Sequence, residues 1–191
     1  MIKVCAGRFG GRGLHLAPEV GTRPSSAKLK EAVFSSLGDR VRGKRVADLF
    51  AGSGALGIEA LSRGAVSAVF VELDPRAVKV IRLNLETLDL HPPEACVRRM
   101  DAWHWLKRYS ADPSDISQRV ELMLLDPPYQ EGTLGRLLPL VTSLLVSGAI
   151  EICVIEHPAV EAESLVLPAG IESKTRCHGS SAFSIIEGMN S

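Results

Sequence analysis

Residues 44–64, KRVADLFAGSGALGIEALSRG, combine a β-branched apolar run, a glycine-rich loop and a helical pattern. The run at 44–50 predicts a buried strand, and residues 54–64 predict a helix. The glycines of the loop are Gly52, Gly54 and Gly57. Glycine lets a backbone turn tightly and approach a ligand, while a helix N-terminus offers free N–H groups. This stretch therefore predicts a strand–loop–helix unit that binds a ligand.

Strand and helix patterns alternate along the rest of the chain. The further strands expected are 65–73, 94–100, 119–126 and 149–157, with a two-stranded finish at 171–179 and 182–188. The helices expected are 75–90, 101–109 and 133–146, preceded by a small glycine-rich hairpin at 1–19 and a serine-capped amphipathic helix at 25–37. This alternation predicts an α/β fold in which helices cover both faces of a parallel sheet.

Composition indicates one globular domain. The chain has 191 residues, of which 46% are hydrophobic and 23% charged. No apolar run approaches the roughly 20 residues that span a bilayer, and the beginning, MIKVCAGRFGG, has no signal-peptide core. The four cysteines are far apart, with no CxxC pair. We therefore expect a cytoplasmic monomer with reduced thiols, no bound metal and no membrane contact.

Charge is distributed unevenly, although the formal net charge is zero. Residues 1–45 hold ten Lys and Arg against three acids, which gives +7, so the remaining residues sum to −7. A basic segment of this kind is typical of a phosphate-binding surface. A solvated helix face has the same composition, and charge alone leaves both interpretations open.

Acidic residues stand near the ends of the first three expected strands. Glu72 ends the second strand, where a carboxylate can hold ribose hydroxyls, and Asp74 follows closely. Asp101 follows the third strand, where it can accept from an adenine amine or cap a helix. The glycine spacing also suits a dinucleotide, but Asp48 would repel a pyrophosphate. Since it could orient an ammonium group instead, the acids favour S-adenosylmethionine.

Residues 124–130, LLDPPYQ, end a buried strand on a carboxylate, because proline cannot continue a central strand. The exocyclic amine of a purine shares its lone pair with the ring and is a poor nucleophile. Asp126 Oδ and the Pro127 carbonyl could accept its hydrogens, while Tyr129 stacks on the base. Pro127 and Pro128 restrict the backbone that positions these groups. The loop thus predicts methylation of an amine on an unpaired or flipped-out base, with a plain turn as the alternative.

With DLFAGSG, VELD and LLDPPY in this order, the chain resembles the class I S-adenosylmethionine-dependent amino-methyltransferases. It is most similar to the RsmD-like family, which methylates the exocyclic N2 of a guanine in 16S ribosomal RNA. The matching motifs include AGRFGGRGL, GTRPSSAKLKEAVFSSL and DLFAGSGALGIEALSRGA. The resemblance implies a single domain over 1–191, with a basic hairpin and helix at 1–40 before a catalytic core at 41–191. The core would be a Rossmann-like, seven-stranded, mainly parallel sheet with helices on both faces.

The resemblance also implies roles for individual residues. The cofactor site would comprise Asp48, Ala51, Gly52, Ser53 and Gly54 on the methionine side, Glu72 and Asp74 near the ribose, and Asp101 and Ala102 at the adenine. The catalytic loop would be Asp126, Pro127, Pro128 and Tyr129. The substrate contacts would be Arg8, Arg12, Arg23 and Pro24. The partner would be 16S rRNA within the small ribosomal subunit or its assembly intermediate.

Two positions depart from the family pattern. Ser25 stands where threonine is usual, and His178 stands where a tyrosine usually precedes the glycine, which puts substrate contacts from the tail in question. Trp103 and Trp105 could cover the adenine or pack their helix. The histidines, His157 among them, are expected to be ordinary surface or strand-end residues without metal-ligand spacing.

Three other functions stay open on the residues. Adenine N6 methylation in DNA or RNA also uses a DPPY loop. Protein-glutamine methylation is disfavoured, because those enzymes usually have asparagine where Asp126 stands. A non-catalytic nucleoside-binding Rossmann module is the third, although nothing structural in such a module would require Tyr129.

Overall fold

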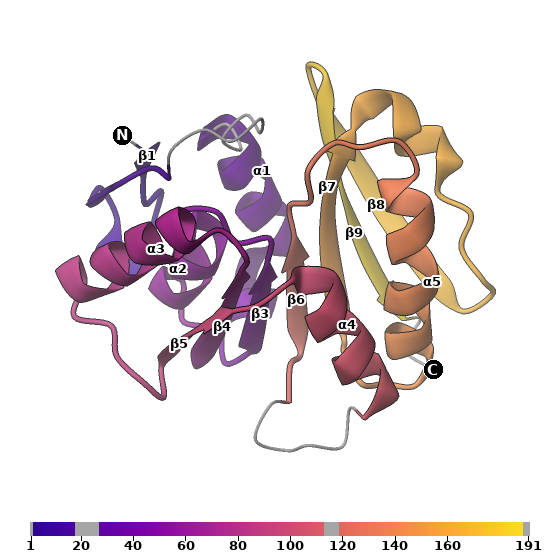
Figure 1. Ribbon diagram of the computed structural model, residues 1–191. Coiled ribbons are helices and arrows are strands. Elements are labelled where there is room, and N and C mark those ends of the chain that lie inside the picture. The colour runs from indigo at the N-terminus through magenta and orange to yellow at the C-terminus, as the bar shows by residue number, and fades with distance from the viewer. Residues whose placement is uncertain (1, 18–26, 113–118, 189–191) are drawn as a thin grey trace.

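The computed structural model describes residues 2–17, 27–112 and 119–188 (Figure 1). The strands are β1 (Ile2–Lys3), β2 (Gly13–Leu14), β3 (Arg45–Leu49), β4 (Ser67–Glu72), β5 (Ala95–Arg99), β6 (Leu122–Leu125), β7 (Ile152–Pro158), β8 (Ile171–His178) and β9 (Ser181–Gly188). The helices are α1 (Ala27–Leu37), α2 (Ala55–Ser62), α3 (Pro75–Thr87), α4 (Ala102–Ala111) and α5 (Thr133–Val146), with short 3-10 helices η1 (Gly7–Phe9), η2 (Gly38–Val41) and η4 (Ala159–Ser164). The predicted substrate residues Arg23 and Pro24, and the serine cap of α1, lie outside the described residues.

Seven strands form the main sheet in the order β5-β4-β3-β6-β7-β9-β8, while β1 and β2 pair separately. The five strands from β3 to β7 run parallel to one another, and β9 pairs antiparallel with both β7 and β8. The predicted seven-stranded, mainly parallel sheet is therefore confirmed. The chain reverses its direction across the sheet between β3 and β6, and open α/β sheets bind ligands at the carboxyl ends of the strands at such a point.

Helices cover both faces of this sheet, as the alternating pattern predicted (Figure 1). One apolar core joins α1, α2 and α3 to the sheet, and it includes Phe34, Ile58 and Ile81, all fully buried. The other joins α4 and α5 to the opposite face and includes Leu106 and Leu137. Strands between two such layers must be apolar on both sides, which is why their sequences read as continuous hydrophobic runs.

The helix expected at 75–90 ends at Thr87. Its beginning agrees with the expectation: Pro75 is its first residue, and the Asp74 carboxylate accepts a hydrogen bond from the Arg76 N–H (2.8 Å). Its end differs because Asp89 has a φ of 55°, in the left-handed region, which an α-helix cannot continue through. Residues 88–90 are compatible with a helix in composition, so the sequence pattern overestimates the length of this helix.

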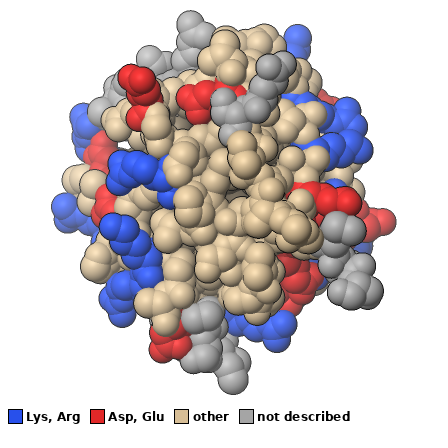
Figure 2. All heavy atoms as spheres, turned by 90° about the vertical axis from the view of Figure 1, so that its right-hand side faces the viewer, with Lys and Arg blue, Asp and Glu red and all other residues tan. Residues whose placement is uncertain are grey.

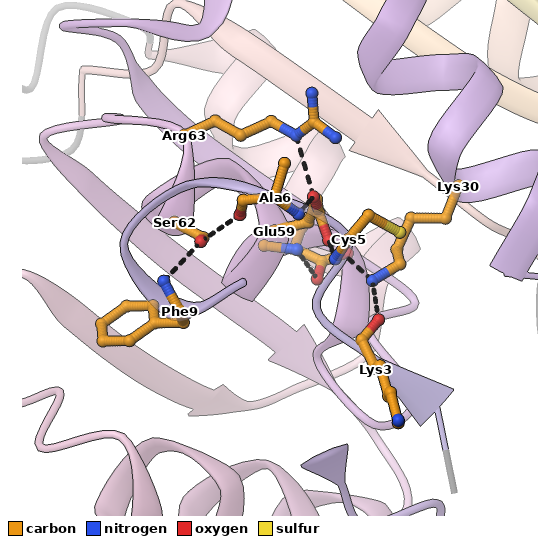
Figure 3. Close-up of polar contacts among 10 residues, drawn as sticks. Lys3, Cys5, Ala6, Phe9, Lys30, Glu59, Ser62 and Arg63 are labelled. Carbon is orange, nitrogen blue, oxygen red and sulfur yellow. Dashed lines mark hydrogen bonds and ion pairs between the residues drawn. The ribbon is translucent and has the colours of Figure 1, made fainter. Parts of the chain in front are cut away.

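The N-terminal extension is fixed to the core by the buried carboxylate of Glu59 on α2 (Figure 3). One oxygen accepts from the Cys5 N–H (2.7 Å) and from Lys30 Nζ of α1 (2.7 Å). The other accepts from the Ala6 N–H (3.1 Å) and from Arg63 Nε (2.8 Å). The Lys30 and Glu59 side chains are both fully buried. This network therefore holds the hairpin and α1 against the helix that follows the glycine loop.

Candidate active site

Asp48 lies near the end of β3, directly before the glycine loop, and its side chain is buried. Its Oδ2 accepts from the Gly57 N–H (2.8 Å), while Oδ1 has no hydrogen-bond partner among the described residues. Burial raises the pKa of Asp48 well above its ordinary value; the Gly57 N–H opposes this, and the carboxylates of Asp126 and Glu72 add to it. A buried oxygen without a donor could accept from the ammonium of a methionine group, and this role of Asp48 stays a prediction.

Glu72 braces the glycine loop from the end of β4. One carboxylate oxygen accepts from the Gly52 N–H (2.8 Å), and the other accepts from the N–H groups of Leu73 (2.7 Å) and Asp74 (2.8 Å). The Asp74 carboxylate is engaged by the N–H and guanidinium of Arg76. Glu72 thus stands at the loop, as expected, whereas Asp74 caps α3; their contacts with a ribose stay predictions.

Asp101 both follows β5 and caps α4, because its side chain accepts from the His104 N–H (2.8 Å). The cap leaves Asp101 and the buried Ala102 at the same edge as the glycine loop, so the adenine role stays a prediction. Of the two tryptophans, Trp105 is buried and stacks on Tyr109 (ring centroids 5.0 Å apart), which confirms helix packing.

Trp103 instead meets Phe50, the residue at the start of the glycine loop, edge-on at 5.8 Å. The Arg136 guanidinium of α5 lies 4.2 Å above the Trp103 ring. These contacts tie α4 and α5 to the loop at its sheet end. Phe50 has a φ of 60°, so the loop leaves the strand through a left-handed residue, and the Trp103 ring supports it there.

Asn84 of α3 links the glycine loop to the N-terminal extension. Its side chain is buried; Oδ1 accepts from the His15 N–H (2.8 Å), and Nδ2 donates to the carbonyls of His15 (3.0 Å) and Ser53 (2.9 Å). All the capacity of this amide except one lone pair is used. Asn84 therefore sets where the Ser53 backbone lies relative to the extension. Its type could be noted in the sequence, but its partners could not.

The DPPY loop leaves β6 beside the glycine-loop strand. β6 pairs in parallel with β3 and β7, and the Asp126 N–H contacts the Leu49 carbonyl (3.4 Å). Pro127 is buried, whereas Tyr129 is 47% exposed. The structure thus brings Asp126 to the same sheet edge as Asp48, as predicted from the strand patterns.

Two partners hold the Tyr129 hydroxyl, one on β7 and one on β9. It donates to Glu156 Oε1 (2.9 Å) and lies 2.9 Å from Ser181 Oγ. Burial raises the pKa of Tyr129 and the Glu156 carboxylate raises it further, so the phenol keeps its proton. A pocket beside the loop is lined by Pro127, Tyr129, Leu134, Ile155 and His157, among others. Glu156 was not predicted as a site residue, although an acid near the end of the expected strand 149–157 was a usable signal.

His157 stands at the end of β7, as expected for a strand-end histidine, but it does not lie on the surface. It is buried, with Nε2 at 2.8 Å from Ser184 Oγ and Nδ1 at 2.9 Å from the Pro158 carbonyl. Ser184 in turn contacts Thr175 (2.7 Å). Only the surface alternative was wrong, because β9 pairs with β7 and covers this position, a pairing between segments far apart in the sequence.

The predicted RNA contacts Arg8 and Arg12 lie on the β5 side of the molecule. Arg8 forms an ion pair with Glu94, just before β5 (2.8 Å), and Arg12 donates to the Thr87 carbonyl at the end of α3 (3.0 Å). β5 is one edge of the main sheet, two strands away from the glycine-loop strand β3 and three from β6. Their contact with RNA stays a prediction.

In the described part of the chain, no helix is both long enough and apolar enough to cross a membrane. No group of three or more histidine, cysteine, aspartate or glutamate side chains could hold a metal ion there.

The main sheet has seven strands and ends in two antiparallel pairings, and acidic side chains hold the glycine loop at its carboxyl edge. These features together define a class I S-adenosylmethionine-dependent methyltransferase. The family described as conserved hypothetical protein 95 matches residues 2–186. The chain belongs to this family, the RsmD family.

Named relatives and solved structures agree with this assignment. Over 140 residues the chain is 30% identical to ribosomal RNA small subunit methyltransferase D of Buchnera aphidicola, covering 73% of this chain and 69% of that one. Over 133 residues it is 33% identical to the Escherichia coli protein of the same name (70% and 63% covered). The structure of protein TTHA0928 of Thermus thermophilus superposes with a TM-score of 0.74 at 31% identity, covering 98% and 99%.

Gly57 offers a test of the Asp48 contact. A Cβ at this position would lie 2.4 Å from the Phe70 ring and 3.0 Å from Asp48 Oδ2. We expect Gly57→Ala to displace both and to weaken S-adenosylmethionine binding about tenfold, with an overpacking cost of about 1–3 kcal/mol. Gly135→Ala is the matched control, because nothing lies within 4 Å of a Cβ there. Titration calorimetry should show parental affinity for Gly135→Ala; the same affinity for Gly57→Ala would contradict the contact.

Proposed function

We propose that this protein transfers the methyl group of S-adenosylmethionine to the exocyclic N2 of a guanine in small-subunit ribosomal RNA. The observation that carries the proposal is the position of the DPPY loop. It follows the strand next to the glycine-loop strand, so Asp126 lies at the same sheet edge as the buried Asp48. The names of the relatives support ribosomal RNA of the small subunit as the substrate.

The protein's own groups would act on the amine rather than on the cofactor. S-adenosylmethionine supplies the methyl as an electrophile when it is bound. Asp126 Oδ and the Pro127 carbonyl would accept hydrogen bonds from the two N–H groups of the amine and turn its lone pair towards that methyl. As the nitrogen bonds to the methyl, the methyl–sulfur bond would break to leave S-adenosylhomocysteine, and the amine would give up one proton to solvent by way of Asp126. Tyr129, held by its hydroxyl against β7 and β9, would keep the base flat beside them.

A loop that accepts hydrogen bonds from an amine fits N2 of guanine and N6 of adenine equally well. The preference for guanine therefore rests on family membership alone. A test separates them. The protein and S-adenosylmethionine are incubated with small ribosomal subunits from an Escherichia coli strain lacking its own methyltransferase D, and the RNA is digested to nucleosides. Mass spectrometry should detect N2-methylguanosine at one position. N6-methyladenosine, or binding of the cofactor without any methylated nucleoside, would overturn the proposal.

A further inference from the structure

The edge strand β8 carries basic side chains on one of its faces. Lys174, Arg176 and His178 occupy alternate positions and are all exposed, so they leave the sheet on the same side. Thr175, between them, faces the other way, since its hydroxyl contacts Ser184 (2.7 Å) in the layer that contains His157. Lys174, Arg176 and His178 are called the β8 row below.

The β8 row ends beside the catalytic loop. His178 is registered opposite Ser181 of β9, and Ser181 Oγ lies 2.9 Å from the Tyr129 hydroxyl. Arg176 is registered opposite Phe183, which pairs in turn with β7. The His178 end of the row therefore lies near Tyr129, and the other two side chains follow along the edge strand at intervals of about 7 Å.

In the part of the chain that the structure describes, neither Lys174 nor Arg176 forms an ion pair. Arg8, by contrast, is paired with Glu94. Glu172 occupies the next alternate position beyond Lys174 on the same face, at the end of the strand away from His178. Figure 2 views the molecule from the side of β8 and α5, where uncharged side chains fill the middle of the face and charged side chains of both signs lie towards its margins.

Charges on an edge strand also prevent unwanted pairing with other strands. Protection of the edge needs charge alone. It does not explain why an aromatic ring, that of His178, stands at the end of the row nearest the catalytic loop. The His178 ring lies nearly parallel to Phe183 (13° between planes, centroids 6.3 Å apart), next to the partly exposed Tyr129. Cations combined with flat rings are how proteins hold unpaired RNA.

We propose that the β8 row binds the RNA strand adjoining the target base, with Lys174 and Arg176 on phosphates and the His178 ring against a flanking base. The proposal rests on the function proposed above, because the target base is assigned to the loop at Tyr129. It places the RNA contact nearer to that loop than Arg8 and Arg12 would.

Filter binding to small ribosomal subunits, measured over a range of salt concentrations, tests this. For Lys174→Ala with Arg176→Ala, we expect binding about tenfold weaker near about 100 mM salt, and a log–log salt dependence shallower by roughly 1.5, which corresponds to two lost phosphate contacts. Lys107→Ala with Arg108→Ala on α4 is the matched control, since it removes the same charge from exposed positions outside the row. It should bind as the parent does.

Parental affinity and salt dependence in the Lys174 and Arg176 double variant would overturn the proposal. Earlier elution of that variant on gel filtration, with binding unchanged, would assign the charges to edge protection instead. Binding is measured without methyl transfer, which separates the two proposals. Intact binding without N2-methylguanosine argues against the proposed reaction alone, whereas methylation with unchanged binding by the variant argues against the β8 row alone.

Discussion

Asp126→Ala abolishes methyl transfer while S-adenosylmethionine still binds: this is the expected result if the DPPY loop activates the amine. The carboxylate stands at the carboxyl end of β6, next to the strand that carries Asp48 and leads into the glycine loop, the predicted cofactor side. Loss of one preorganised group at the reacting atom typically lowers the rate by roughly 10²–10³-fold. We expect at least that loss in a radiolabelled-methyl assay, with a cofactor dissociation constant within about threefold of the parental value by calorimetry.

Asp126→Asn is the informative control, because asparagine keeps one oxygen acceptor in a side chain of the same shape. It should lose less activity than alanine at the same cofactor affinity. Turnover retained by Asp126→Ala would remove the role assigned to this carboxylate. Equal losses of turnover and of cofactor binding would instead make Asp126 part of the cofactor site.

Lys30→Met should destabilise the fold by about 3–5 kcal/mol, since it leaves the Glu59 carboxylate buried without its ammonium partner. The Lys30 and Glu59 side chains are fully buried and 2.7 Å apart, and Arg63 and two backbone N–H groups complete the shell. Urea unfolding followed by circular dichroism measures the change. The Lys30→Met, Glu59→Gln double variant should recover part of the loss, because no charge is then buried unpaired. Additive losses would show that the two groups do not interact.

The same site sets a pH dependence. Burial acts to raise the pKa of Glu59, but hydrogen bonds from the Cys5 N–H, Lys30 and Arg63 outweigh it, so the folded pKa is lowered from its ordinary value of 4.5. A lowered folded pKa means that this carboxylate contributes stability above pH 4.5, and that the contribution is lost as the pH falls through the folded pKa. The stability difference between the parent and Glu59→Gln should therefore narrow in acid.

Local pattern was enough to predict the sheet, its parallel core and the glycine loop, because buried strands and turns depend on residues close together in the sequence. The same pattern predicted that Asp48, Glu72 and Asp126 share one edge of the sheet, because the carboxyl ends of parallel strands lie at the same edge. The second anchor of Tyr129 was not predictable in this way. Ser181 is 52 residues from Tyr129, and the two meet only because β9 lies between β7 and β8.

Asn84 and Glu59 show the same limit. Each sits in a helical pattern that predicts only which face is buried, while their partners His15 and Cys5 lie 69 and 54 residues away. A buried polar residue signals that a partner exists, because an unpaired one is costly. It does not say which segment supplies it. Asp101 differs from these two, because local sequence predicted both of its features: it caps α4, and it follows the end of β5.

Because β9 comes late in the sequence, the segment around the glycine loop and the segment around Tyr129 can be completed at different times during synthesis on the ribosome. Synthesis runs from the N-terminus, so the glycine loop, Glu72 and Asp101 have all emerged long before Ser181. Until β9 enters between β7 and β8, Tyr129 lacks one of its two anchors and the edge strand β8 has no neighbour to pair with. The predicted cofactor side is thus made early, and the side proposed to meet the base is completed by the last described strand.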